Sequence, residues 1–247
     1  LSVSQFGLSR LSSLWSTDFT SPDSVKLHLA WWPRLFTTLL CGAALAVAGV
    51  LMQQVLRNPL ASPSTLGVAS GSSFALMLAT LYAPWLLEWS YSLVALIGGV
   101  STVGLVFALS WRRALSPTVV IVSGLVVNLY FGAVSTVLLM MNQDKLNGLM
   151  IWGAGSLVQS GWEDVQYLAP RLVIATLMAF MFVKPLSLLQ LSEEGAKSLG
   201  VSLAKLRIAC LGLAVLLTAW VVSAVGVIGF VGLAAPALAR LMGVHRL

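Results

Sequence analysis

Charged residues are scarce in this chain of 247 residues. Asp, Glu, Lys and Arg together make up 9% of it, whereas hydrophobic residues make up 58%. A soluble domain carries about 25% charged residues, so the scarcity indicates an integral membrane protein. The formal net charge of +6 does not indicate a nucleic-acid partner, because the cations are scattered between apolar runs. In such a chain they report membrane topology.

Cysteine and histidine are equally rare. Cys41 and Cys210 lie inside apolar runs and are expected to be small buried side chains, so they indicate neither a disulfide framework nor a metal site. His28 and His245 lie outside the apolar runs, and the chain has no cluster of Ser, His and Asp or of His and Glu. The sequence therefore predicts no cofactor and no intramembrane enzyme.

Seven apolar runs have about the 20 residues that a helix needs to cross the hydrocarbon core. The last two form one continuous stretch, which we expect to turn where Gly226, Gly229 and Gly232 precede Pro236. The predicted fold class is therefore an all-α polytopic membrane protein. The predicted spans are Leu35–Leu56, Thr65–Tyr82, Tyr91–Trp111, Thr118–Met140, Tyr167–Val183, Leu206–Gly226 and Val227–Met242.

No ionisable residue lies near the middle of any predicted span. A charged Arg or Asp at that depth costs about 2.5–3.5 kcal/mol on insertion scales, and proton relays and voltage sensors require such residues. Their absence argues against a proton-coupled transporter and against a charge-gated channel.

The loops between the spans differ in charge from one side of the membrane to the other. The side richer in cations is cytoplasmic by the positive-inside rule. Residues 1–34 are then an external, periplasmic segment, and residues 35–247 form the transmembrane domain with a cytoplasmic C-terminus. The cations on the cytoplasmic side are Arg57, Arg112, Arg113, Lys184, Lys197, Lys205, Arg207, Arg240 and Arg246.

A polar segment, Gln53–Gly71, interrupts the apolar runs. Asn58-Pro59 and Ser62-Pro63 end one helix and begin the next, because proline cannot donate to a helical ladder and restricts the residue before it. Gly67 and Gly71 then give the following helix a smooth face for close packing. This polar segment, Gln53–Gly71, is longer than a tight turn between helices requires.

A short apolar segment, Asn147–Leu157, lies between two spans on the external side. Apolar runs of 10–14 residues are more often interfacial or re-entrant than spanning. Its glycines allow close packing against a neighbour or a passing solute. The alternative is an amphipathic surface helix that Trp152 and Trp162 hold at the headgroups.

On the cytoplasmic side, Leu189–Gly200 predicts a short helix with a serine cap, two glutamates in its first turn and a glycine at its end. Its small apolar face suits a helix that docks into the groove of another protein, whereas a solvated linker would not need that face. The residues concerned are Ser192, Glu193, Glu194, Ala196, Leu199 and Gly200.

The fourth span begins with Ser116-Pro117-Thr118 on the cytoplasmic side. Pro117 occupies the first turn, where proline is tolerated. The two hydroxyls indicate either a cytoplasmic constriction or ordinary helix capping.

Three stretches agree in order and spacing with one known family: Pro33–Gly71 around Arg57-Asn58-Pro59-Leu60-Ala61-Ser62-Pro63, then Leu191–Gly200, then Gly226–Arg240. The chain resembles the permease subunits of ABC importers for iron-siderophores, haem and cobalamin. The resemblance implies about ten transmembrane helices per permease half. This chain is similar to helices two to eight, without the first and the last two. Its start at Leu1 without Met also indicates a fragment or processed product.

Within that family, Gln53–Ala61 and Ser223–Phe230 are most similar to the N-terminal half of permeases in which two halves are fused into one polypeptide. The resemblance implies an iron(III)-hydroxamate cargo. The alternatives are cobalamin, haem or a catecholate siderophore within the family, and outside it an ATPase-independent channel or facilitator.

The same resemblance implies the partners and assigns the sites. The partners are a dimeric ABC ATPase, a periplasmic siderophore-binding protein, a second permease half and the bacterial inner membrane. ATPase coupling falls on Ser192–Gly200 and docking of the binding protein on Arg34. The span Thr118–Met140 lines the pathway, and the residues expected at the gates and in the pathway are Ser116, Pro117, Thr118, Asn128, Trp152, Gly153 and Gly155.

Two positions depart from the family pattern. Trp31-Trp32-Pro33-Arg34 stands where Arg-Leu-Pro-Arg is usual, so one of two arginines expected to meet acidic residues of the binding protein is missing. Ala237 stands where the family usually has His after the proline. Both departures fit one specialised half of a fused protein.

Overall fold

The computed structural model describes residues 25–113, 115–157, 161–188 and 203–243. Every regular element within these ranges is a helix, which confirms the predicted all-α class. The predicted coupling segment Ser192–Gly200 and residues 1–24 of the predicted external segment lie outside the described residues.

The described helices are named in chain order. They are η3 (Leu27–Trp31), α2 (Trp32–Leu56), η4 (Pro63–Leu66), α3 (Val68–Tyr82), α4 (Trp85–Ser110), η5 (Trp111–Arg113), α5 (Pro117–Met141), α6 (Gln143–Gly153), α7 (Trp162–Met181), α8 (Val183–Leu188), α10 (Leu203–Val225) and α11 (Val231–Leu241).

Each of the seven predicted spans coincides with one of these helices. Four segments are long and apolar enough to cross a membrane: His28–Leu56, Ser90–Arg113, Pro117–Met141 and Leu203–Val225. The helix α7 has 20 residues and begins five residues before the predicted span. The helices α3 and α11 have only 15 and 11 residues, fewer than the roughly 20 that a complete helical crossing needs.

Both short helices begin near the middle of a long neighbour. Gly232, in the first turn of α11, lies against the middle of α2: a Cβ added at Gly49 would overlap the carbonyl oxygen of Gly232. Gly67, just before α3, lies beside Asn128 near the middle of α5, since a Cβ added at Gly67 would be 3.7 Å from the Cα of Asn128.

The prediction of full-length helical spans at Thr65–Tyr82 and Val227–Met242 is therefore wrong. Each stretch contains a short α-helix that begins beside a long neighbouring helix, and the stretch before it is not α-helical. We call these two irregular stretches the first re-entrant segment (Arg57–Gly67) and the second re-entrant segment (Gly226–Phe230). The second includes the turn predicted at Gly226 and Gly229, whereas Gly232 and Pro236 lie inside α11.

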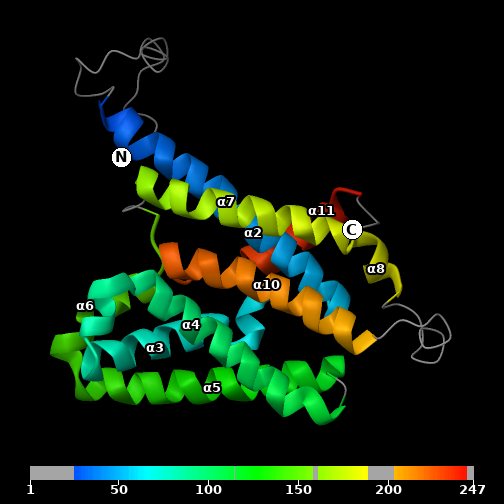
Figure 1. Cartoon of the computed structure of the whole chain (residues 1–247), viewed down its shortest axis with the longest axis horizontal. Coiled ribbons are helices and arrows are strands. Elements are labelled where there is room, and N and C mark those ends of the chain that lie inside the picture. Colours follow the sequence, from blue (N-terminus) through cyan, green and yellow to red (C-terminus); the bar gives the residue numbers. More distant parts are fainter. Residues whose placement is uncertain (1–24, 114, 158–160, 189–202, 244–247) are drawn as a thin grey trace.

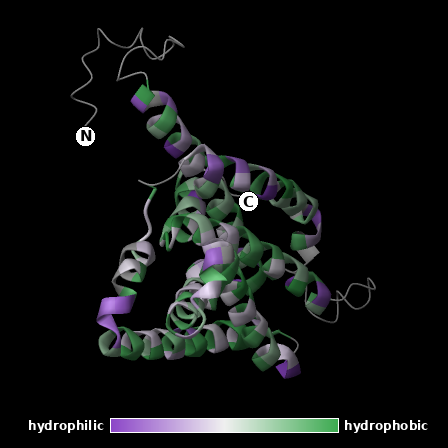
Figure 2. Ribbon diagram, turned by 60° about the vertical axis from the view of Figure 1, so that its left-hand side comes forward, coloured by the Kyte–Doolittle hydropathy of each residue, from purple (hydrophilic) through white to green (hydrophobic). Residues whose placement is uncertain are grey.

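The helix α10 occupies the centre of the molecule. It lies between α2 and α7 on one side and α3 and α4 on the other, and it contacts all four (Figure 1). In its most apolar stretch of 18 residues 67% are buried, against 17% in that of α5. Hydrophilic residues gather at the ends of the helices, as expected for a bundle that spans a membrane (Figure 2).

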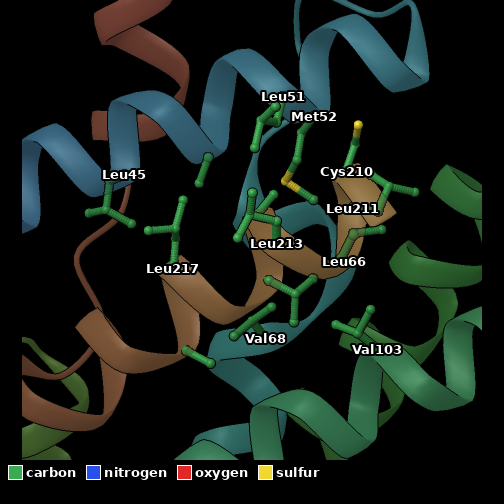
Figure 3. Packing of buried hydrophobic residues seen from close by; sticks show 14 of the residues in the cluster. Leu45, Leu51, Met52, Leu66, Val68, Val103, Cys210, Leu211, Leu213 and Leu217 are labelled. Atoms are coloured by element: carbon green, nitrogen blue, oxygen red, sulfur yellow. The ribbon is translucent and has the colours of Figure 1, made fainter. Parts of the chain in front are cut away.

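The core is built of aliphatic side chains that α10 shares with α2 (Figure 3). Leu45, Leu51 and Met52 of α2 meet Leu211, Leu213 and Leu217 of α10, and all six are buried. Leu66, Val68 and Val103 close the opposite side of α10. Since lipid tails are as apolar as these side chains, close van der Waals packing holds such helices together.

Two glycines of α2 test the importance of that packing. Gly49→Ala should lower the free energy of unfolding by about 1–3 kcal/mol, the usual cost of overpacking, because the new Cβ would push α11 away. Gly42→Ala should leave it unchanged or raise it by up to about 1 kcal/mol through better helix propensity, because nothing lies within 4 Å of a Cβ at Gly42. Unfolding of the purified full-length variants in a denaturing-detergent titration measures both. Equal effects of the two substitutions would refute the close approach of α2 and α11.

Candidate functional site

The segment after α6 is joined to the second re-entrant segment by backbone contacts. The N–H of Ser156 donates to the carbonyl of Val225 at 2.9 Å. Gly155 and Gly226 both have positive φ, +68° and +76°. A Cβ at Gly155 would overlap the carbonyl oxygen of Val227, and one at Gly226 would overlap that of Trp152. Two segments that are far apart in sequence therefore meet without side chains between them, and glycine is required at both positions.

The helix α6 is packed into the molecule rather than isolated on its surface. Leu146 and Leu149 are buried together with Leu76 of α3 and Ala95 of α4. The Trp152 ring is half-buried and meets Tyr91 edge-on, with ring centroids 5.8 Å apart. Trp162, by contrast, is 39% exposed, and its Nε1–H donates to the carbonyl of His28 at 2.8 Å. The two tryptophans are thus in different environments.

The first re-entrant segment is stabilised by its own short-range hydrogen bonds. The N–H of Leu60 donates to Oδ1 of Asn58 at 2.9 Å, and the hydroxyls of Ser62 and Ser64 are 2.7 Å apart. The Thr65 hydroxyl donates to the carbonyl of Ser62 at 2.6 Å. These local bonds, typical of Asn and Ser in turns, satisfy part of the polar segment Asn58–Thr65 where it is not α-helical.

The two re-entrant segments meet around a small cavity of about 30 Å³. The hydroxyl-bearing residues come from the first segment and from α10, whereas the second segment contributes apolar residues and a glycine. A larger hollow of about 340 Å³ lies beside it, between residues 154–157 and Val227–Gly229. The small cavity is lined by Leu45, Ser62, Pro63, Ser64, Ala69, Thr218, Val222, Val227, Ile228, Gly229, Phe230 and Gly232.

The residues predicted at the gates and in the pathway fall in three places. Asn128 lies half-buried beside Gly67, where α3 begins. Trp152 and Gly153 end α6, and Gly155 follows two residues later, next to the second re-entrant segment.

Ser116, Pro117 and Thr118 form the first turn of α5, about three helical turns from Asn128. The Ser116 carbonyl accepts from the N–H of Val120 at 3.0 Å, and no side-chain cap is formed. Thr118 is exposed. The residues predicted at the internal gate, Ser116–Thr118, therefore lie apart from Asn128 and from Trp152–Gly155, which lie near the re-entrant segments.

Arg34, expected to meet the binding protein, lies in the first turn of α2. It is half-buried, and its carbonyl accepts from the Thr38 hydroxyl at 2.6 Å. The residues expected to couple to an ATPase, Ser192, Glu193, Glu194, Ala196, Leu199 and Gly200, all lie outside the described residues.

Sequence reasoning gave no role to a polar contact between α2 and α11. Nη1 of Arg240 donates to Oε1 of Gln53 at 2.9 Å, and Gln53 is buried. This bond fixes the far end of the half-helix α11 to α2, whereas Gly49 and Gly232 fix its beginning. Both residues belong to the stretches that carried the family resemblance, but nothing in the sequence indicated that they meet.

Comparison with known proteins places the chain among transporters. The model of the FecCD transport family matches residues 3–246, which confirms the resemblance predicted from the sequence. The iron(3+)-hydroxamate import system permease protein FhuB of Salmonella typhimurium is 42% identical over 236 residues, which cover 95% of this chain and 34% of that protein. The chain thus spans about a third of the length of this relative.

Two further relatives are similar over most of the chain. The Fe(3+) dicitrate transport system permease protein FecC of Escherichia coli is 34% identical over 224 residues, 90% of this chain and 67% of that protein. A solved structure of a metal-chelate type ABC transporter in an inward-facing conformation has a TM-score of 0.81 and 31% identity. It covers 94% of this chain, which in turn covers 74% of it.

The backbone contact between the two segments can be tested with an engineered disulfide. Cysteines introduced at Ser156 and Val225, with Cys41 and Cys210 replaced by alanine, should cross-link readily because the backbones at these positions are hydrogen-bonded. Adding Gly226→Ala should reduce the cross-linked fraction severalfold, because the overlap and the positive φ together impose roughly 1–3 kcal/mol of strain.

Gly229→Ala is the matched control, since nothing lies within 4 Å of a Cβ at that position. It should leave the cross-linked fraction unchanged. An undiminished cross-link in the Gly226→Ala protein would show that the two segments do not depend on this glycine.

Proposed function

Because this chain belongs to the FecCD transport family, we propose that it is part of the transmembrane permease of an ABC importer in the bacterial inner membrane. The importer moves iron(III)-hydroxamate chelates from a periplasmic binding protein to the cytoplasm. The chain corresponds to the N-terminal half of a fused permease, and the second half belongs to the same polypeptide. It carries out no chemistry itself, and a separate dimeric ATPase hydrolyses ATP.

The observation that carries this proposal is the similarity to the hydroxamate permease over 95% of the chain. The identity to that permease is 42%, against 34% to the dicitrate permease. This difference supports a hydroxamate cargo over another iron chelate.

The geometry is consistent with a pathway for a large, weakly charged solute. Half-helices that start at mid-membrane beside irregular backbone are typical of transporters, whose substrate sites lie near the bilayer midplane. The surroundings offer hydroxyls of Ser62, Ser64 and Thr218 and backbone groups. Such a lining contacts a chelate without holding it too firmly for release, so no side chain is expected to ligate the iron.

The helix α10 supports a mechanical route from the ATPase to the external gate. It begins directly after the proposed coupling residues 192–200, and its other end, Val225, is hydrogen-bonded to Ser156 beside Gly155. A 23-residue helix is about 34 Å long. Movement at its cytoplasmic end would therefore be transmitted to Trp152–Gly155, the proposed external gate.

The transport cycle then has two main arrangements of these helices. Docking of the binding protein near Arg34 and ATP binding at the cytoplasmic side each favour one arrangement. The coupling equals the difference in each ligand's affinity for the two states. In this cycle α5 lines the pathway at Asn128, and Ser116–Thr118 lies at the internal gate.

Two other functions give different results in simple assays. A permease of the same family with cobalamin, haem or a catecholate cargo would be revealed by competition in an uptake assay. An ATPase-independent channel or facilitator would transport equally well after substitution of Glu193, Glu194 or Gly200.

Copurification of the full-length protein with candidate ATPases tests the importer class. The double variant Glu193→Arg/Ala196→Arg should lose the bound ATPase at least tenfold, because two arginines would replace an acidic and a small apolar contact of the coupling helix. The variant must remain inserted and must unfold at the temperature of the wild type.

Lys205→Ala, just beyond the proposed helix and exposed, is the control and should retain the ATPase. Unchanged binding by the double variant would move the coupling role to another segment. If neither the wild type nor the variant retains any ATPase, the importer class is wrong and the channel should be pursued.

A further inference from the structure

An apolar groove lies between α2, α7, α8 and α11. Its volume is about 360 Å³, and its lining is almost entirely aliphatic or aromatic. Phe180, one of the lining residues, is 66% exposed, so the groove is open on one side in the described chain. Because apolar cavities stay dry, a groove of this kind in a membrane protein takes either a lipid acyl chain or another apolar segment.

Two polar side chains continue the lining of this groove at one end. Gln53 lies three residues after Val50 and seven after Ala46, which places all three on one face of α2. Arg240 lies four residues after Pro236, on the face of α11 that lines the groove. Both polar residues are in the last turn of their helices, and they are joined by the hydrogen bond described above. The groove therefore runs from an apolar interior to a polar end.

This polar end offers more hydrogen-bond donors than the described chain accepts. Gln53 is 6% exposed, and its buried Nε2 has no partner among the described residues. Arg240 is half-buried, and its guanidinium bonds to no described residue other than Gln53, although a guanidinium carries five N–H donors. A buried donor that is left without an acceptor is costly. A negatively charged acceptor would satisfy both side chains and neutralise the arginine.

The carboxylates of α7 are too far away to be that acceptor. Trp162, at the start of α7, contacts Phe36 near the start of α2, so Glu163 and Asp164 lie at the opposite end of α2 from Gln53. The last turns of α2 and α11 are on the side predicted to be cytoplasmic from its excess of cations. Basic pockets between transmembrane helices on that side bind the headgroups of anionic lipids.

We propose that an anionic phospholipid binds between α2, α7 and α11, with an acyl chain in the apolar groove and its phosphate at Arg240 and Gln53. The phosphodiester oxygens accept from the donors that no described residue satisfies, and the acyl chain fills the groove beside them. A further apolar helix would fill the groove as well, but it would leave the guanidinium without an anion. This lipid site goes beyond the transport function proposed above and does not depend on the cargo.

The experiment uses the full-length permease, stripped of lipid in detergent and titrated with two phospholipids that have identical acyl chains. Phosphatidylglycerol is anionic, whereas phosphatidylcholine has the same phosphodiester but no net charge. Native mass spectrometry measures the apparent affinity of the most tightly bound lipid. The unfolding temperature is recorded with each lipid and without lipid.

The variants separate the headgroup from the acyl chain. Arg240→Gln removes the charge at the polar end, and Arg240→Lys keeps it. Arg112→Gln is the matched control, because Arg112 is an exposed cation on the same predicted side and does not line the groove. Ala239→Phe places a ring in the groove. Its control is Leu238→Phe, at a neighbouring position that is 58% exposed and outside the lining.

The wild type should bind phosphatidylglycerol about fivefold more tightly than phosphatidylcholine, the effect of one basic residue on an anionic lipid. Arg240→Gln should abolish this preference, whereas Arg240→Lys and Arg112→Gln should retain it. Ala239→Phe should weaken binding of both lipids, and Leu238→Phe should weaken neither. Phosphatidylglycerol should raise the unfolding temperature of the wild type more than phosphatidylcholine does. In Arg240→Gln the two lipids should raise it equally, whatever the temperature at which the lipid-free variant unfolds.

Three results would overturn the proposal. Equal affinity of the wild type for both lipids, or the same loss in Arg240→Gln and Arg112→Gln, would assign the attraction to the cationic surface as a whole. Undiminished binding by Ala239→Phe would show that no acyl chain occupies the groove. If the wild type binds neither lipid, another part of the full-length permease fills the groove instead.

Discussion

A peptide group that enters the hydrocarbon interior without a hydrogen-bond partner costs several kcal/mol. The architecture depends on how the two re-entrant segments, which are not α-helical, satisfy their peptide groups. The first re-entrant segment satisfies its groups with local bonds from Asn58, Ser62 and Thr65. Directly before the second segment, the carbonyl of Val225 at the end of α10 accepts from the N–H of Ser156. Within the described residues, the backbone N–H groups of Val227–Phe230 have no protein acceptor.

Close packing follows from the same two interruptions. A half-helix has fewer turns with which to hold its neighbours, so each contact must be short. Glycine makes this possible for α11, where Gly49 and Gly232 bring the backbones together. About two helical turns after Gly232, Arg240 donates to Gln53. On the other side, Gly71 and Gly98 bring α3 and α4 into similar contact. Between them α10 is apolar and largely buried, as the proposed transmission of movement across the membrane requires.

The sequence predicted the class of fold, and each predicted span contains an observed helix, because hydropathy and length act locally along the chain. It also predicted that the polar segment Gln53–Gly71 was more than a turn and that the chain would bend near Gly226.

The sequence did not predict that α3 and α11 are half-helices, since a run such as Val227–Met242 is apolar whether it is helical or extended. The chain is not helical at Gly226 and Phe230, where φ is positive. The residue type phenylalanine gives no indication of such a backbone angle. The meeting of Gly155 with Gly226 likewise depends on tertiary packing. The coupling residues were indicated by a capping pattern alone, and the described part of the chain does not include them.

The central claim is that the two re-entrant segments face a water-filled route at mid-membrane, and thiol accessibility tests it most directly. Single cysteines at Ser64 and Gly229, both exposed beside the small cavity, are compared with one at Leu177 of α7, which is 61% exposed on a helix face. The full-length protein is studied in membranes with Cys41 and Cys210 replaced by alanine. The account predicts that a charged, membrane-impermeant thiol reagent labels the cysteines at 64 and 229 at least tenfold faster than the one at 177. Equal protection of all three positions would contradict it, because the irregular backbone would then be enclosed by protein and no aqueous route would pass there.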